Sequence, residues 1–431
     1  MKRVVIVGGG YTAIETYRQL LAEIRAQRVK VTIVAALPVH VFHGWTGEVL
    51  SGLLSTHSTF SSLQSIFSHA ELRVGRVIKV LSGSKQIQIL NHTGIQQLSY
   101  DELVLASGAT DKGSMIPGAN EYSFLLRSPE DIQALKNKIL ENIQKASETN
   151  DLVLRHHYLQ TLIIGGGFAG VEMAAAIQEL ARKAMKNYPQ LQGCQTEISI
   201  LHRGEDILPE LQNHFPSLVK KAKYYLENLN IRYLCHTKVT QIYKDGVKLE
   251  NQWVQGSIIL CTVGTVPNVL PIDMKVYQEK YPTRETLQIE HDDDIWCGGD
   301  VAQVIHYKNK LPCPSNALWA MKQGQHIGKN ITRKLYGKSL LPFRYRGLGQ
   351  AASLGIGRGI MELYGIPITG FLAWILRILF FLYFMPLKRN AVRVVLEFFS
   401  TFITGRFLVP VWSSRFPENH TISTVLDTIS S

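Results

Sequence analysis

Two glycine-rich segments have the spacing that binds phosphate groups. Residues 8–13 read GGGYTA and residues 165–170 read GGGFAG, and each segment follows a run of branched apolar residues typical of a buried strand. Where such a strand turns directly into a helix, free backbone N–H groups and the positive end of the helix dipole hold a pyrophosphate. The sequence therefore predicts two dinucleotide sites. Their expected binding positions are Gly8, Gly10 and Ala13 in the first loop and Gly165, Gly167 and Gly170 in the second.

A second signal follows each loop at a matched distance. One apolar run ends at Gly108, 100 residues after Gly8, and another ends at Gly264, 99 residues after Gly165. A single glycine-rich match is a weak indication, because packing also places glycines between strands and helices. Its repetition with the same spacing indicates an internal repeat of a whole nucleotide-binding unit. We therefore expect an α/β fold with two Rossmann-like units.

Regular elements around the loops are expected to hold them in place. Helical spacing runs to Leu21 after the first loop and to about Met185 after the second, and branched residues at 29–34 and 197–201 predict the next strands. Strand, helix and strand in this order form a βαβ unit. Further predictions are antiparallel strands within 72–81 and 86–90 and a connecting helix within 128–155.

An acidic residue past a glycine pair adds a candidate sugar-binding group. Residues 295–297 predict a short strand, and Gly298, Gly299 and Asp300 follow it. At a strand end the carboxylate of Asp300 is free to accept hydrogen bonds from sugar hydroxyls. An alternative is that Asp300 caps a helix running to Val304, because aspartate is a favoured N-cap. The sequence is compatible with both roles.

Composition limits the partners of the chain. Among its 431 residues, 46 Lys and Arg outnumber 34 Asp and Glu, which gives a formal net charge of +12. The basic residues are scattered, without a dense tract or aromatic interleaving, so a membrane surface and cofactor phosphates are favoured and no nucleic acid is expected. The five cysteines form no C-x-x-C pair, which excludes a zinc ribbon and a local dithiol motif. We expect a reducing, cytoplasmic location and no metal site.

The C-terminal part of the chain has a different composition. Residues 368–387 are apolar apart from Arg377, and at about 1.5 Å per residue they are long enough to span the roughly 30 Å core of a bilayer. A charge near the middle costs a span about 2.5 kcal/mol or more. The next stretch has an apolar helical face, as an interfacial helix does. This face comprises Val392, Val395, Leu396, Phe399 and Ile403. We expect monotopic membrane attachment; a true span and a dimer or domain-packing surface are the alternatives.

Taken in order, these motifs resemble those of the two-dinucleotide-binding-domain flavoprotein reductases. The resemblance covers nearly the whole chain and is carried by residues 8–13, 100–108, 165–170, 262–268 and 299–302. Three further features point to the type II NADH dehydrogenases, the single-subunit NAD(P)H:quinone oxidoreductases. They are residues 170–172, residues 342–346 followed by 352–355, and the apolar segment that begins at 370–374.

The resemblance implies a membrane-associated enzyme that does not pump protons. NAD(P)H would pass a hydride to FAD, and two electrons would then pass to a quinone. The expected architecture is an FAD domain at 1–112 and 269–345, an inserted NAD(P)H domain at 113–268, and a membrane-association region at 346–431 that also forms a homodimer. FAD would contact Gly8, Gly10, Ala13, Ser107, Gly108, Asp300, Val301 and Ala317. NAD(P)H would contact Gly165, Gly167, Gly170, His202, Arg203 and Gly264.

Glu172 is the first of two candidate catalytic residues. It matches a residue that the family uses beside the nicotinamide and the quinone, and proton delivery is the implied role. Its place near the start of the helix after the second loop offers an alternative, because the helix dipole stabilises a carboxylate there.

The chain departs from the family at the strand ends that face each adenosine ribose. Where members carry an acid, this chain has Ala35 and Ala36, and the bulky Tyr17 lies where the first helix packs closely. Loss of the acid predicts weaker FAD binding. The equivalent strand of the second unit ends in His202 and Arg203, where NADH-preferring members carry a glutamate. A basic pair attracts a 2′-phosphate, so NADPH is predicted over NADH, and two merely exposed residues are the alternative.

The quinone-contact motif is altered as well. Members read A-Q-x-A-x-Q, whereas residues 317–324 read ALWAMKQG. Leu318 has no hydrogen-bonding group, but the Lys322 ammonium can polarise a quinone carbonyl, which makes Lys322 the second candidate catalytic residue. Either the quinone binds differently or another acceptor is used, and a regulatory flavoprotein is the remaining alternative. A sulfide:quinone reductase needs a redox cysteine pair, and only Cys297 and Cys313 are placed to approach a flavin.

Overall fold

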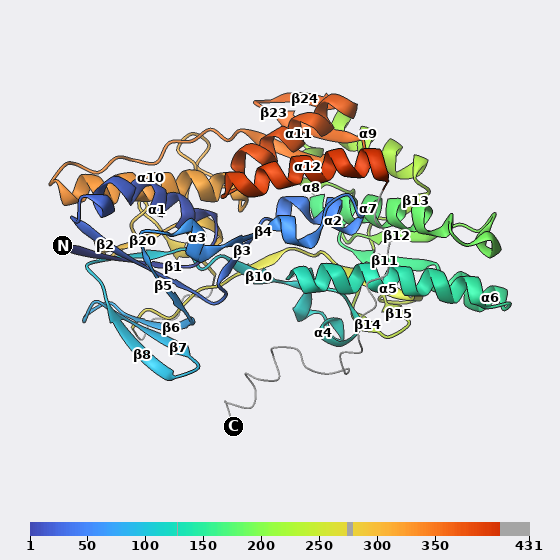
Figure 1. The fold of residues 1–431 in the computed structure, drawn as a ribbon, viewed down its shortest axis with the longest axis horizontal. Helices are drawn as coiled ribbons and strands as arrows, with labels where there is room; N and C mark the ends of the chain where they lie inside the picture. Colours follow the sequence, from blue (N-terminus) through green and yellow to red (C-terminus); the bar gives the residue numbers. More distant parts are fainter. Residues whose placement is uncertain (127, 274–278, 406–431) are drawn as a thin grey trace.

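The computed structural model describes residues 1–126, 128–273 and 279–405, and its first parallel sheet lies in the left half of Figure 1. The strand order is β20-β9-β1-β2-β5, and every neighbouring pair is parallel. Its elements are β1 (Lys2–Val7), α1 (Tyr11–Arg25), β2 (Val29–Ala35), β5 (Glu71–Val74), β9 (Glu102–Leu105) and β20 (Ile295–Cys297). The first glycine loop therefore leaves the carboxyl end of the central strand, where α/β sheets bind their ligands.

The second parallel sheet repeats this plan in the right half of Figure 1. Its strand order is β13-β12-β11-β17. Its elements are β11 (Gln160–Ile164), α7 (Phe168–Met185), β12 (Glu197–Leu201), α9 (Pro216–Asn228), β13 (Ile231–Leu234) and β17 (Ile258–Cys261). In both sheets the strand before the glycine loop pairs with two others. One of them follows the next helix, and the other comes later in the chain. The predicted pair of Rossmann-like units is confirmed.

One predicted strand belongs to a different sheet. Residues 72–81 alternate without interruption, but the structure divides them at Gly75 between β5, which joins the parallel sheet, and β6 (Arg76–Leu81). Only β6 forms the expected antiparallel sheet, with β7 (Gln86–Asn91) and β8 (Gly94–Ser99). The amide of Gly75 donates to the carbonyl oxygen of Ala35, and a Cβ on it would lie 2.7 Å from Ile89. The glycine thus permits the turn between the sheets.

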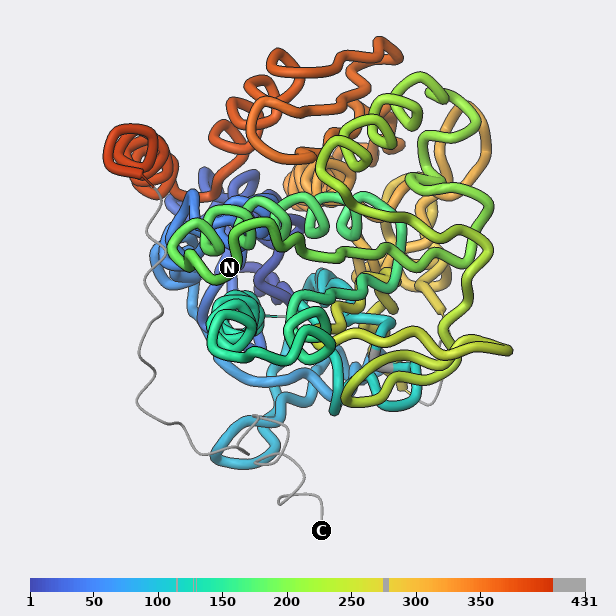
Figure 2. The backbone as a smooth tube through the Cα atoms, turned by 90° about the vertical axis from the view of Figure 1, so that its right-hand side faces the viewer, coloured from blue at the N-terminus to red at the C-terminus, as the bar shows by residue number. Residues whose placement is uncertain are grey.

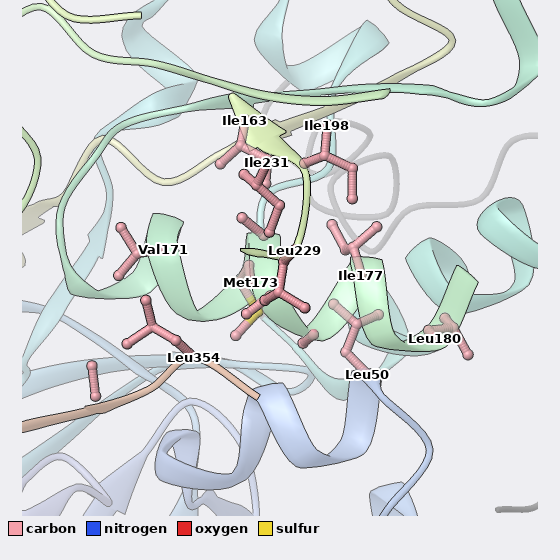
Figure 3. Packing of buried hydrophobic residues seen from close by; sticks show 14 of the residues in the cluster. Leu50, Ile163, Val171, Met173, Ile177, Leu180, Ile198, Leu229, Ile231 and Leu354 are labelled. Carbon is pink, nitrogen blue, oxygen red and sulfur yellow. The ribbon is translucent and has the colours of Figure 1, made fainter. Parts of the chain in front are cut away.

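The second unit shares its hydrophobic core with segments from both ends of the chain. Helix α7 lies between the second sheet and α2 (Thr46–Leu50), as Figure 3 shows. Ile163 and Ile198 approach α7 from the sheet, whereas Leu50 and Leu354 approach it from the opposite side (Figure 3). The predicted connecting helix is α5 (Pro129–Glu148), which Ser128 begins with a capping box, and it packs against the same core.

The C-terminal elements cover one side of both units. They are α10 (Ala317–Leu335), β22 (Gly349–Ser353), β23 (Gly359–Leu363), β24 (Ile366–Thr369), α11 (Gly370–Phe384) and α12 (Lys388–Thr404). Viewed from the side, α12 is seen nearly end-on at the outer edge of the molecule (Figure 2). Helix α11 is shorter than the predicted apolar segment, because Pro386 disfavours a helical residue before it. Residues 406–431 of the predicted membrane-association region lie outside the described residues.

Within the described part of the chain, no helix is both long and apolar enough to cross a membrane.

Shorter elements complete the described chain. The strands are β3 (Val39–Val41), β4 (Phe60–Ser62), β10 (Ala109–Asp111), β14 (Gln241–Tyr243), β15 (Gly246–Lys248), β16 (Trp253–Gln255), β18 (Thr265–Pro267), β19 (Tyr281–Pro282) and β21 (Ala302–Gln303). The helical turns are η1 (His43–Trp45), η2 (Thr56–Thr59), α3 (Leu63–Ile66), η3 (Gly113–Met115), α4 (Ala119–Tyr122), α6 (Leu152–Tyr158), η4 (Pro189–Leu191), α8 (Pro209–Gln212) and η5 (Gly299–Val301).

Candidate active site

The first glycine of each loop is fixed by a close backbone approach. Gly8 has a φ of +125° and Gly165 a φ of +116°, a region that other residues rarely adopt. A Cβ added to Gly8 would lie 2.1 Å from the carbonyl oxygen of Ala106, and one added to Gly165 would lie 2.6 Å from that of Thr262. In both units this carbonyl directly follows the neighbouring parallel strand, β9 or β17. The two loops therefore repeat one backbone design.

The helix behind each loop begins next to open space. Gly10 and Gly167 are the N-cap residues of α1 and α7, and neither helix has a side-chain cap. A Cβ on Gly10 would meet no atom within 4 Å, and one on Gly167 would meet only a Glu210 carboxylate oxygen at 3.8 Å. A Cβ on Gly170 would lie 1.9 Å from a carbonyl oxygen of its own loop, so α7 can approach its strand only with glycine there. Both helix starts fit a pyrophosphate.

Ser107, Gly108 and Gly264 meet where the chain crosses between the units. Strand β10 pairs antiparallel with β18. The Ser107 hydroxyl donates to the carbonyl oxygen of Asn268 over 2.6 Å, and the Asn268 amide nitrogen donates to the carbonyl oxygen of Gly108 over 2.8 Å. Gly108 and Gly264 both have positive φ, of +68° and +95°. The two apolar runs that end at Gly108 and Gly264 therefore meet where the chain crosses between the units.

Asp300 and Val301 lie beside the first loop, in η5. A Cβ on Gly299 would lie 2.8 Å from the Thr12 hydroxyl of α1. Burial raises the pKa of Asp300, and no described side chain or amide hydrogen-bonds its carboxylate. The carboxylate is therefore able to accept a sugar hydroxyl. The alternative of a helix cap is wrong, because η5 has three residues and strand β21 follows it.

The start of α10 is tied to the same turn. Ala317 is the first residue of α10, and the Asn316 side chain caps the helix by accepting from the Trp319 amide over 3.2 Å. The Gln323 side chain accepts from the Gly299 amide over 2.7 Å. Ala317 therefore begins the helix whose later residues Ala320 and Gln323 contact Gly299, next to Asp300.

Tyr17 does not crowd the first loop. Its ring is buried and packs edge-on against Phe67, and its hydroxyl accepts from the His69 amide over 3.0 Å. Its side chain reaches away from the first loop to the turn after α3. Ala35, by contrast, is the last residue of β2 and supplies no side-chain acceptor.

His40 is a residue near the first loop that the sequence did not single out. Its Nδ1 donates to the carbonyl oxygen of Gly9 over 3.1 Å, and burial lowers its pKa to about 4. The neutral ring therefore fixes the loop from β3. No local pattern marks this contact, because the partners are far apart in the sequence and the donor lies in a segment without clear periodicity.

His202 and Arg203 follow β12 but have different roles. The His202 Nδ1 accepts from the Gly166 amide over 3.1 Å, and burial lowers the pKa of this histidine. Arg203 is exposed. Only Arg203 is therefore a cation at this strand end, and the expected basic pair reduces to one charge. Glu210, which the sequence did not single out, places a carboxylate near the same loop.

Glu172 belongs to a buried cluster of three charges. Its carboxylate lies 2.9 Å from the Arg377 guanidinium and accepts from the Ser353 amide over 2.8 Å. The same guanidinium lies 2.6 Å from Glu48, and the Arg377 side chain is only 2% exposed. Burial raises the pKa of Glu172, against the opposing pull of Arg377. Arg377, which counts against a membrane span, thus joins α11 to α2 and α7.

A small polar cavity adjoins this cluster. It has a volume of about 20 Å³ and is lined by Glu172, Glu179, Ser353 and Arg377 among others. This is room for about one water molecule. Glu179 lies two helical turns after Glu172 on α7 and accepts from the Ile356 amide over 2.9 Å. Two carboxylates of α7 therefore hold the turn between β22 and β23.

Lys322 lies in a separate network. Its ammonium donates to the Gln325 side chain over 3.1 Å, and the Gln325 amide donates to Glu15 of α1 over 2.8 Å. No described contact joins Lys322 to Glu172. The structure therefore does not bring the two candidate catalytic residues together.

The cysteines carry no redox pair in the described chain. All five are free thiols. Burial raises the pKa of Cys297, and it raises that of Cys313 to about 11. Neither thiol is activated as a thiolate, which a sulfide:quinone reductase would require.

Comparison with known proteins identifies the family of the chain. The family model described as pyridine nucleotide-disulphide oxidoreductase matches residues 2–324. The type II NADH:quinone oxidoreductase of Staphylococcus haemolyticus is 26% identical over 382 residues, which cover 86% of this chain and 91% of that protein. The protein of the same name from Staphylococcus aureus strain NCTC 8325 is 24% identical over 385 residues, with the same coverage.

A solved structure shows the same fold. It is the structure of NDH2 from Plasmodium falciparum in complex with NADH, with a TM-score of 0.84 and 16% sequence identity. The match covers 95% of this chain and 99% of that one, so the C-terminal elements are included. With its family model, relatives and fold in agreement, the chain belongs to the pyridine nucleotide-disulphide oxidoreductase family and is similar to its type II NADH:quinone oxidoreductases.

Proposed function

We propose that the chain is an FAD-dependent NAD(P)H:quinone oxidoreductase that does not pump protons. The observation that carries this proposal is the repeated pair of glycine loops, each with an open helix start, joined by β10 and β18. Bound FAD would supply the two-electron chemistry between the nicotinamide and the quinone. The chain itself would position the two dinucleotides.

The proposed division of the chain follows the repeat. The FAD domain comprises 1–112 and 269–345, the inserted NAD(P)H domain comprises 113–268, and the membrane-association region comprises 346–431. The FAD positions are Gly8, Gly10, Ala13, Ser107, Gly108, Asp300, Val301 and Ala317. The NAD(P)H positions are Gly165, Gly167, Gly170, His202, Arg203 and Gly264. Their arrangement around two helix starts supports this assignment.

Glu172 is proposed as the residue that stores and delivers a proton. Burial raises its pKa, so the carboxyl group is more easily protonated than an exposed one. The adjoining cavity has room for a water that can exchange the proton. Lys322 is proposed as a secondary group, because one of its three N–H donors is held by Gln325 and the others are left to polarise a quinone carbonyl.

Arg203 supports a preference for NADPH. It is the exposed cation at the strand end that faces an adenosine ribose in this fold. Glu210 opposes it with a carboxylate near Gly167. Steady-state rates with each nucleotide test the preference, and a higher kcat/KM with NADH would contradict it.

Membrane attachment is proposed through α11 and α12, from the cytoplasmic face and without a span. Exposed apolar side chains on both helices support it, and they include Phe371, Leu372, Leu379, Val395, Leu396 and Phe399. A homodimer through the same region is a further proposal. Its test is the mass of the detergent-solubilised protein.

Anaerobic titration of purified protein tests the enzymatic proposal. We expect a yellow flavin spectrum that NADPH bleaches and a short-chain quinone restores. A colourless protein, or a flavin that neither nucleotide bleaches, would contradict the proposal and favour a regulatory role. A bleached flavin that oxygen restores but quinones do not would show a different acceptor.

A further inference from the structure

A groove rich in cations lies where α12 ends. It has a volume of about 380 Å³ and lies between the C-terminal half of α7, the turn before β23 and the last turn of α12. Its cationic side chains are those of Arg182, Lys183, Lys186 and Arg358. Glu179 is the one acidic residue among its described lining residues. The groove therefore carries an excess of positive charge.

Most of this charge is not neutralised by the protein. Lys183 and Lys186 are exposed, and no described residue pairs with either ammonium. Arg182 donates to the carbonyl oxygen of Leu229 rather than to an acid. The Arg358 guanidinium lies 3.7 Å from Glu179, a partly exposed pair of small energy.

The dipole of α7 explains only some of the cations in the groove. The negative end of α7 stabilises cations on its own last turn, which explains Arg182 and Lys183. Arg358 comes from the turn before β23 and lines the same groove from another element. Cations from two elements therefore converge on one hollow.

The groove is continuous with the exposed apolar surface of α12. Phe402 lines the groove and is 59% exposed, and its neighbour Ile403 is 69% exposed. The exposed apolar side chains that continue along α12 are Val392, Val395, Leu396 and Phe399. An apolar surface of this extent is rarely left to water. Cations and apolar side chains thus meet at Phe402.

We propose that the groove binds the phosphate-bearing headgroup of an anionic membrane lipid while the apolar side chains of α12 enter the bilayer. This inference rests on the membrane attachment proposed above and adds a lipid class to it. The apolar side chains supply affinity for any bilayer, and the groove adds selectivity for negative charge. A lipid engages both parts, whereas a free phosphate engages the cations alone.

Vesicle co-sedimentation of the full chain tests the proposal. The vesicles contain phosphatidylcholine alone or phosphatidylcholine mixed with phosphatidylglycerol. We expect wild-type protein to bind both and to bind the anionic vesicles more tightly. The double variant Lys183→Ala/Lys186→Ala should bind anionic vesicles about tenfold or more weakly than wild type, and neutral vesicles equally well.

A matched control removes the same charge elsewhere. Lys244 and Lys248 are exposed on the β14–β15 hairpin, on the side of the molecule opposite α12 (Figure 1). The variant Lys244→Ala/Lys248→Ala should keep wild-type binding to both vesicles. An unchanged thermal midpoint and an unchanged rate with a short-chain quinone would establish that both double variants are intact.

Four outcomes would contradict the proposal in different ways. No binding to either vesicle would overturn the membrane attachment itself. Equal wild-type binding to both vesicles would overturn the headgroup site and leave the attachment in place. Equal losses in both double variants would show a general effect of net charge. Equal wild-type binding to both vesicles, together with inorganic phosphate binding that only Lys183→Ala/Lys186→Ala loses, would show a site for free phosphate instead.

Discussion

Glu15 and Glu172 occupy the same position in the two units, seven residues after the first glycine of each loop, yet they are paired differently. Glu15 contacts Arg18 on its own helix, and that arginine also donates to the carbonyl oxygen of Pro386. Both carboxylates thus connect a glycine-loop helix to the C-terminal elements. Glu15 accepts from Gln325 of α10 and reaches Pro386 through Arg18, whereas Glu172 contacts Arg377 of α11.

The difference lies in solvent access. The Arg18 side chain is 37% exposed, whereas that of Arg377 is 2% exposed. The Arg18 contact is therefore a wet one, open to solvent at the arginine, whereas the Arg377 contact is sealed around a buried guanidinium. The Glu15 and Glu172 side chains themselves are 11% and 18% exposed, so the equivalent positions differ in the exposure of their cation rather than in their own.

Removing each arginine in turn should give the largest difference in stability between the two contacts. Arg377→Met leaves the buried Glu48 and the partly buried Glu172 without their cation, which costs about 3–5 kcal/mol of the free energy of unfolding. Arg18→Met removes a pair whose arginine is exposed and leaves Glu15 its hydrogen bond from Gln325, so it should cost only about 1 kcal/mol. Urea denaturation of the two purified variants measures both.

A triple variant sharpens this test. Arg377→Met combined with Glu48→Gln and Glu172→Gln removes the buried charges together and should recover part of the lost stability. Equal losses for Arg377→Met and Arg18→Met would contradict the distinction between a sealed and a wet contact.

The fold of both units could be predicted from the sequence, whereas the cluster around Arg377 could not. An apolar run that ends in glycine is a local signal, so the sequence predicts β1, β11, α1 and α7 close to their observed bounds. Arg377 lies in an apolar run, and its partner Glu48 is distant in the sequence and in a segment without clear periodicity. Local patterns report which residues form a helix, but they do not report which side chain meets another element.

Alanine at the third glycine of each loop should assign one cofactor to each unit. Gly10→Ala and Gly167→Ala are compatible with the backbone, because their φ angles are −88° and −77° and space is open at each Cβ. A methyl group there would crowd a bound pyrophosphate at a cost of about 1–3 kcal/mol. Gly10→Ala should weaken flavin binding about tenfold to a hundredfold, whereas Gly167→Ala should retain flavin and raise KM for NAD(P)H.

Flavin absorbance per protein and steady-state kinetics distinguish these results. Gly83→Ala is the control, since its Cβ also meets no atom within 4 Å and it lies in the turn between β6 and β7. It should change neither quantity. Flavin loss in Gly167→Ala with retention in Gly10→Ala would reverse the assignment.

The residues that follow β12 show which features of the site could not be predicted from the sequence. His202 and Arg203 read as a basic pair, but the loop amide of Gly166 uses the histidine as an acceptor, and burial keeps it neutral. The sequence does not indicate a role for Glu210, because its approach to Gly167 depends on the path of the chain after β12. Residue types alone indicate charge in water, whereas desolvation in the fold decides which group keeps it.

Reversing the remaining charge should change nucleotide preference by a moderate amount. Arg203→Glu replaces an attraction for a 2′-phosphate with a repulsion, so kcat/KM with NADPH should fall about tenfold while that with NADH changes little. No counterpart exists in the first unit, where Ala35 ends the strand. Parallel losses with both nucleotides would contradict a phosphate contact and indicate a general disturbance of the loop.

The smallest expected effect concerns the pH dependence that the sealed contact confers. The pKa of Glu172 lies above its ordinary value of 4.5 because of burial. At pH values between 4.5 and this raised pKa, the folded chain therefore binds more protons than the unfolded chain. Stability from this group therefore falls as pH rises through that window. Glu172→Gln cannot ionise, so its stability relative to wild type should rise with pH, by about 1.4 kcal/mol for each unit by which the pKa is raised. Thermal midpoints of both proteins, measured from pH 4.5 upward, give the difference. If that difference stays constant with pH, the carboxyl of Glu172 titrates as an ordinary exposed group, and the contrast with a wet surface contact is lost.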